Sequence, residues 1–223
     1  MSIIAASSLR ARFRRLARRW TASDEGVAAV EFGLIVPIMA VMFIGAVELS
    51  QAITVDRRVT QVANSTADLV ARFSPPPNGA NGISQTEITD IMKVGGYILA
   101  PYSANPLKIV LRGVSSSPTS ATNTKQAWIC TYTGAGNSLS CSCTNTSYAL
   151  PANLVTTLDS VVISEVTYNY KPLVFDYFMK SMGTGGGPAG THLMKETAIL
   201  KPRSQNINLL QTSNTPCPSP TFP

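Results

Sequence analysis

The feature that most constrains this chain is an apolar run near its amino terminus, at residues 27–47. Only Glu31, Gly33, Pro37 and Gly45 interrupt the run. A helix needs about 20 predominantly apolar residues to cross the hydrocarbon core of a bilayer. The run therefore predicts a transmembrane helix, and we expect the chain to be anchored in a membrane.

Glu31 is the exceptional residue of this run. A carboxylate at the centre of a membrane helix costs about 2.5–3.5 kcal/mol on insertion scales, and such residues usually carry a function. If the backbone is cut after Gly26, the new amino group of Val27 is positively charged and Glu31 lies one helical turn further on. We expect these opposite charges to pair, within one chain or between packed neighbours, because a low dielectric strengthens their attraction.

The residues around this position carry a resemblance to a known family. The run Gly26-Val27-Ala28-Ala29-Val30-Glu31-Phe32, with a basic leader before it and an apolar helix after it, resembles the processing site of type IV prepilins. Its continuation to Pro37 is similar to the TadE/TadG-like minor pseudopilins of the Tad (tight adherence, Flp-type) pilus. The resemblance covers residues 21–73. It implies cleavage after Gly26 by a prepilin peptidase and a role for Glu31 in assembly.

The leader before the apolar run is strongly basic. Residues 1–25 hold six Arg against two acids, a net charge of +4, whereas the rest of the chain holds 12 basic and 10 acidic residues, a net charge of +2. The six are Arg10, Arg12, Arg14, Arg15, Arg18 and Arg19. An arm that binds nucleic acid is the alternative, but Arg clustered directly before a span holds that side in the cytoplasm. We therefore expect no nucleic-acid partner, a cytoplasmic amino terminus and a carboxyl-terminal part across the bacterial inner membrane.

Residues that are apolar except for Thr66 keep helical spacing beyond the span. They recur at alternating intervals of three and four, at Ala52, Val55, Val59, Val62, Thr66, Leu69 and Phe73. The helix is expected to continue to Phe73 and to end at Ser74, because three consecutive prolines follow. Unbroken from Val27, it would be about 70 Å long.

The remainder predicts a mixed head. Ser84 and Glu87 have the spacing of a capping box for a second helix that ends before Pro101. Segments rich in Val, Ile, Thr and aromatic residues predict strands, at 107–114, 126–132, 160–170 and 192–200. The third of these is expected to run from the sheet edge into the core with a register shift midway, and a short helix is expected at 175–182 before a turn at 183–190.

Together these elements predict an α+β fold: a long amino-terminal transmembrane helix that continues into a periplasmic stem and packs on an antiparallel β-sheet head, as in pilins. The expected parts are a leader removed by prepilin peptidase (1–26), a transmembrane helix (27–50), a helical stem (51–73), a periplasmic α+β head (74–211) and a Pro-rich tail (212–223).

Four cysteines follow the span, at Cys130, Cys141, Cys143 and Cys217. Disulfides persist in the periplasm, and four cysteines allow three complete pairings. A bridge from Cys130 to Cys141 or Cys143 would close a polar loop, and Cys217 could hold the tail. A metal site is disfavoured because Cys141-Ser142-Cys143 lacks the usual two-residue spacing and His192 is the only histidine.

No catalytic group of residues is recognisable. His192 has no motif around a candidate nucleophile, and Gly183-Thr184-Gly185-Gly186-Gly187 is not followed by the Gly-Lys-Ser/Thr of a phosphate loop. Asp159, Glu165 and Asp176 do not have the spacing of a catalytic pair. We therefore expect neither an enzyme nor a cofactor.

The preferred hypothesis is a minor pseudopilin that acts structurally in the assembly or priming of a Tad-type pilus for surface attachment. The resemblance implies as partners the membrane, the prepilin peptidase, other pilins and pseudopilins, and indirectly the assembly platform and its ATPase. Three alternatives remain: an uncleaved single-span anchor with a periplasmic binding head, a secreted protein cut by signal peptidase after Ser50-Gln51-Ala52, and a periplasmic enzyme.

Overall fold

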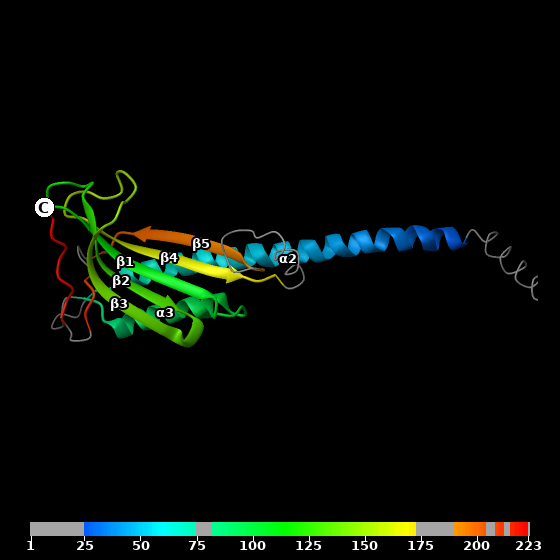
Figure 1. Cartoon of the computed structure of the whole chain (residues 1–223), viewed down its shortest axis with the longest axis horizontal. Coiled ribbons are helices and arrows are strands. Elements are labelled where there is room, and N and C mark those ends of the chain that lie inside the picture. The colour runs from blue at the N-terminus through cyan, green and yellow to red at the C-terminus, as the bar shows by residue number, and fades with distance from the viewer. Residues whose placement is uncertain (1–24, 75–81, 173–189, 204–207, 212–214, 223) are drawn as a thin grey trace, which may run out of the picture. The chain divides into compact units, whose positions relative to one another are not determined.

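The computed structural model describes residues 25–74, 82–172, 190–203, 208–211 and 215–222 (Figure 1). The chain forms two compact units, residues 1–49 and 50–223. Helix α2 (Glu25–Ala71) contributes residues to both units. Each unit is considered separately below.

The first unit contains the apolar part of α2. Large side chains are exposed all around it: Phe32 is 71% exposed, Met42 70% and Phe43 70%. The helix passes Pro37 without ending, as helices in membranes tolerate. By length and composition it can cross a membrane, which agrees with the expected anchor.

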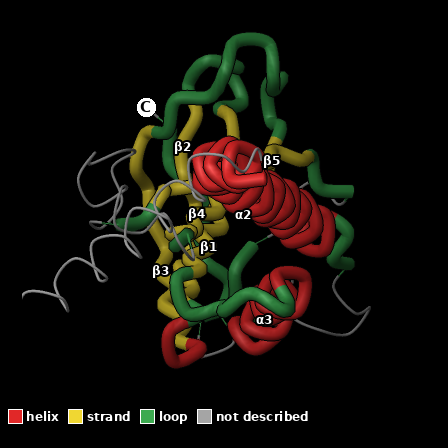
Figure 2. The backbone as a smooth tube through the Cα atoms, turned by 90° about the vertical axis from the view of Figure 1, so that its right-hand side faces the viewer, coloured by secondary structure: helices red, strands yellow, loops and turns green. Residues whose placement is uncertain are grey.

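The second unit is an antiparallel five-stranded sheet covered by helices, so the fold is α+β. The strand order is β3-β2-β1-β4-β5. Figure 2 shows α2 and α3 on the same face of the sheet. The bounds are α3 (Gln85–Leu99), β1 (Leu107–Ser116), β2 (Thr124–Thr133), β3 (Ser138–Ser147), β4 (Ser160–Tyr170) and β5 (His192–Leu200).

One hydrophobic core joins the stem part of α2, α3 and the sheet. The spacing of three and four along α2 buries Val55, Val59 and Val62 completely. Gly95 of α3 allows a close approach, because a Cβ atom there would lie 2.9 Å from Ile109 Cδ1 and 3.0 Å from Val62 Cγ1. The apolar stripe predicted from the sequence therefore packs against the head of the same chain.

Both ends of α3 are fixed by side chains. The predicted capping box is confirmed: the Glu87 backbone N–H donates to Ser84 Oγ at 3.2 Å, and the Ser84 N–H donates to Glu87 Oε2 at 2.8 Å. At the other end, the Arg58 guanidinium of α2 donates to the carbonyls of Ile98 (3.1 Å) and Ala100. A cation at this end also opposes the partial negative charge of the helix terminus.

Several sequence predictions need correction. Helix α2 ends at Ala71 rather than Phe73, and Leu69 is 40% exposed while Val70 is buried. Strand β4 is not at an edge: β1 and β5 flank it, and its register is continuous on both sides. The helix predicted at 175–182 and most of the turn predicted at 183–190 lie outside the residues that the structure describes.

The register irregularities lie in other strands. One falls between Gly113 and Val114 in the β1–β2 pairing and one between Gln126 and Trp128 in the β2–β3 pairing. At Gly113 a Cβ atom would lie 2.2 Å from Trp128 Nε1, so only glycine leaves room for the indole. Gly113 pairs with Trp128 and Val114 with Gln126, so the residue left out of the β1–β2 register is Ala127 of β2. Strand β3 was not predicted at all.

Candidate functional site

The predicted processing residues lie together in the first two turns of α2. Gly26 and Val27 are in the first turn, and Glu31 and Phe32 follow one turn later. All four are exposed. Because residues four apart share a helix face, Glu31 lies on the same side of α2 as Val27, the residue that would carry the new amino group. The six topogenic Arg residues lie outside the described part of the chain.

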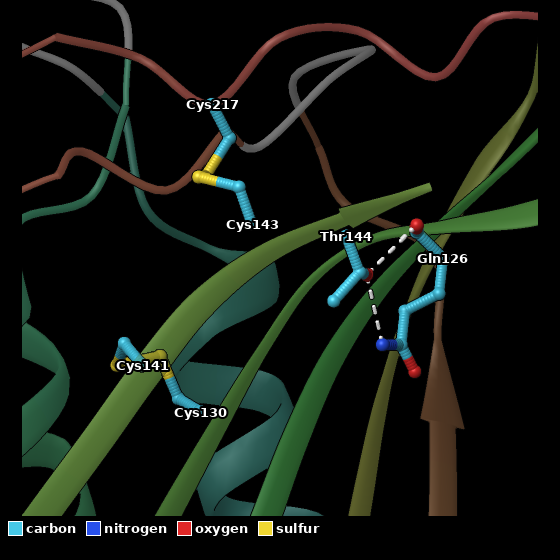
Figure 3. The surroundings of a disulfide bond; sticks show 6 residues. All are labelled: Gln126, Cys130, Cys141, Cys143, Thr144 and Cys217. Atoms are coloured by element: carbon cyan, nitrogen blue, oxygen red, sulfur yellow. Dashed lines mark hydrogen bonds between the residues drawn. A yellow bond between two sulfur atoms is a disulfide. The ribbon is translucent and has the colours of Figure 1, made fainter. Parts of the chain in front are cut away.

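The four cysteines form two disulfides, Cys130–Cys141 and Cys143–Cys217 (Figure 3). The first joins directly paired residues of β2 and β3, and the second ties β3 to the carboxyl-terminal tail. This result selects one of the three possible pairings. With every cysteine oxidised, no thiolate is left for a metal.

Further bonds hold the tail against β2 and β3. Lys125 Nζ donates to the Thr221 carbonyl at 2.5 Å and lies 5.8 Å from the centre of the Phe222 ring. Asn145 Nδ2 donates to Thr221 Oγ1 at 2.8 Å. Beside the disulfide, Thr144 exchanges hydrogen bonds with Gln126 of β2 (Figure 3). The tail is thus attached to the sheet at several points.

A half-buried ion pair occupies the sheet face that points away from the helices. Arg112 donates to Glu165 Oε2 at 3.2 Å and to Gln126 Oε1 at 3.1 Å. The Tyr148 hydroxyl donates to Glu165 Oε1 at 3.1 Å. Burial and then the Glu165 carboxylate raise the pKa of Tyr148 above its usual value. Because each partner is held by the others, the arrangement locks three strands together.

The residues considered for catalysis lie apart or serve the fold. Asp159 bonds Lys201 at 2.5 Å, whereas Glu165 bonds Arg112, and Asp176 lies outside the described residues. His192 is exposed at the start of β5. Within the described ranges, no three His, Cys, Asp or Glu side chains gather as metal ligands would.

The sequence signal for the predicted processing residues of α2 is local, because all four lie within one short motif, and their role stays a prediction. Sequence reasoning missed Arg112, Lys125 and Asn145, whose partners lie far away in the sequence. Asn145 lies in β3, whose Ser- and Asn-rich sequence did not predict a strand. Arg112 and Lys125 carry no sequence signal of their own, because their partners lie in other strands or in the tail.

Comparison with known proteins supports the family resemblance described for the sequence of α2. Residues 26–68 match the family model described as TadE-like protein. Neither the curated proteins nor the solved structures contain a match to this chain. The matched segment starts at Gly26 and runs from the exposed apolar turns into the buried stem. Over residues 26–68, this chain is therefore similar to TadE-like proteins.

Proposed function

We propose that this chain is a minor pseudopilin that acts structurally in the assembly or priming of a Tad-type pilus used for surface attachment. The observation that carries the proposal is the coincidence of the TadE-like match with an exposed apolar helix. Val30 is 65% exposed and Ile38 64%. An exposed apolar surface of this extent is typical of contact with lipid or with other apolar helices. A pilin contacts lipid before assembly and other pilin helices during it.

The proposed location is the inner membrane, with a cytoplasmic leader and a periplasmic head. The two disulfides support this orientation, because they persist in an oxidising compartment such as the periplasm. In this arrangement the prepilin peptidase removes residues 1–26 at the cytoplasmic face. The five-part division of the chain given above belongs to the same proposal.

Assembly would then use the helix and the head differently. Val27 supplies a positive amine and Glu31 a carboxylate, so neighbouring helices dock with their charges paired. The head, held on the stem by one shared core, presents surfaces to other pilins and pseudopilins. The energy for pilus assembly comes from the assembly platform and its ATPase.

The test is the amino-terminal residue and intact mass of the full chain, extracted from membranes of its native host with and without the prepilin peptidase. We expect a start at Val27 that depends on the peptidase. A start at Met1 in both strains would instead favour the uncleaved anchor with a binding head. A start at Ile53 would indicate a secreted protein cut after Ala52, and either result would contradict the pseudopilin proposal.

A further inference from the structure

A cleft of about 380 Å³ opens at one end of the second unit. Its walls come from segments distant in sequence: the end of β1, the loop before β4, Asn208 and the carboxyl-terminal tail. Figure 1 shows the tail and these loops gathered at the same end of the sheet. Small-molecule sites have volumes of roughly 300–1,000 Å³. The cleft is therefore large enough for a small ligand and too compact for a folded partner.

The cleft carries polar groups that are available to a ligand. The hydroxyls of Ser115 and Ser219 and the side-chain amide of Asn208 line it. None of the three side chains bonds a residue in the described part of the chain. A hydroxyl and an amide can each donate and accept. They suit a ligand that also presents both donors and acceptors.

Apolar side chains flank these polar groups. Phe222 and Leu158 line the cleft, and Leu158 is 71% exposed. Leu158 also has a φ of 57°, a conformation that is uncommon for residues other than Gly, Asn and Asp. An aromatic ring offers a flat apolar surface. The cleft thus combines a platform for C–H groups with hydrogen-bonding groups beside it.

The charge at the cleft is balanced. Asp159 lines it, but Oδ2 of this carboxylate accepts from Lys201 Nζ at 2.5 Å and Oδ1 accepts from the Ser160 N–H at 2.9 Å. The carboxylate is therefore already paired, which disfavours a strongly charged ligand. A neutral molecule rich in hydroxyls fits the lining better.

The position of Phe222 is fixed by the rest of the tail. The Cys143–Cys217 disulfide, the Lys125–Thr221 bond and the Asn145–Thr221 bond all hold this segment to β2 and β3. The wall that carries the ring is thus built before a ligand arrives, so that little ordering accompanies binding.

We propose that this cleft binds a neutral saccharide. The hydroxyls of a sugar ring bond Ser115, Ser219 and Asn208, and its C–H face packs on Phe222. The proposal concerns the head alone and does not depend on cleavage after Gly26 or on pilus assembly.

The test uses the full chain in lipid nanodiscs, because detergents with sugar headgroups would compete for the cleft. The probes are the methyl β-glycosides of glucose, galactose and N-acetylglucosamine, each measured by saturation-transfer difference NMR. We expect transfer to at least one probe. Phe222→Ala should raise its Kd by about three- to tenfold, the effect of losing one aromatic contact, and Asn208→Ala should raise it as well.

Tyr97→Ala is the matched control, because Tyr97 is 79% exposed on α3 and does not line the cleft. Its Kd should equal that of the unchanged chain. Circular dichroism and mapping of both disulfides show that each variant is folded. The absence of transfer to all three probes would overturn the proposal, and so would equal affinities in the Phe222→Ala and Asn208→Ala variants and the unchanged chain.

Discussion

The hydroxyl oxygens of Thr66 and Ser164 lie 2.8 Å apart inside the hydrophobic core, and both residues are fully buried. Thr66 belongs to the stem part of α2, and Ser164 lies at the middle of β4. Thr66 Oγ1 also bonds the Val62 carbonyl at 2.8 Å. This pair is a polar contact between the stem and the sheet at a position where the neighbouring contacts are apolar. It therefore fixes where the helix sits along β4.

Replacing Thr66 by Val should destabilise the head by about 1–3 kcal/mol, because the buried Ser164 hydroxyl loses the partner shown above. Ser164→Ala should cost less, since Thr66 keeps its bond to Val62, and the double variant should cost less than the sum. The measurement is urea unfolding of the full chain, followed by Trp128 fluorescence in a Trp20→Phe background.

Thr60→Val is the matched control. The Thr60 hydroxyl donates to the Asp56 carbonyl one turn earlier in the same helix, and within the described residues it bonds no residue of the sheet. It should change the unfolding free energy little. Strict additivity of the two core variants would show that the pair is not coupled.

The two disulfides should contribute unequally. Cys143 and Cys217 are 74 residues apart, whereas Cys130 and Cys141 are 11 apart. Loop closure in the unfolded chain gives about 4.5 kcal/mol for the longer loop and about 3 kcal/mol for the shorter. Cys143→Ala with Cys217→Ala should therefore lower the unfolding free energy more than Cys130→Ala with Cys141→Ala, and should also expose the tail to proteolysis. A larger loss in the second pair would mean that core packing outweighs chain entropy.

Stability should fall in acid through Asp159. Burial raises the pKa of this carboxyl, but hydrogen bonds from Lys201, Thr156 and Ser160 outweigh burial and leave the pKa below its ordinary value of 3.8. The stabilisation is thus complete above that value and is lost as the pH falls through the lower pKa of the folded state. Unfolding free energies at about pH 6 and about pH 3 should differ less in Asp159→Asn than in the unchanged chain.

Lys201→Met tests the cause of that shift, because it removes the hydrogen bond that lowers the pKa most. It should lose part of the same pH dependence while the carboxyl remains. An unchanged pH dependence in both variants would place the acid sensitivity in other groups.

Local signals made much of the fold predictable. The buried stripe of α2 follows from apolar spacing over many turns, and the capping box at Ser84 needs only four residues. The bounds predicted for the strands at 160–170 and 192–200 agree with β4 and β5. Within α2 the stripe wrongly predicted burial only for Leu69, which is exposed while Val70 is buried. Alternating intervals of three and four average 3.5 residues, so after several turns they depart from the helical period of 3.6 residues.

Features that depend on distant segments could not be predicted. Strand β3 has the sequence Ser-Leu-Ser-Cys-Ser-Cys-Thr-Asn-Thr-Ser, in which Thr is the only residue type that is enriched in strands. The pairing of β3 with β2 places Cys130 beside Cys141 and leaves Cys143 for Cys217. Because β3 was not predicted, the disulfide pairing could not be predicted either. The predicted processing residues at Gly26 to Phe32 form one short motif that can be recognised in the sequence, and their processing role stays a prediction. The cleft instead takes its lining from several separate segments.

The function of Glu31 can be tested by separating insertion from assembly. Glu31→Ala and Glu31→Gln both remove the charge, and Gln retains the approximate size of the side chain. Neither should reduce the amount of full-length chain in the membrane, because removing a charge favours insertion. Both should reduce the yield of sheared pili, since the Val27 amine would lose its partner. Met39→Ala, at an exposed position of the same helix, should leave the pilus yield unchanged. Normal piliation in Glu31→Ala would rule out the proposed charge pair.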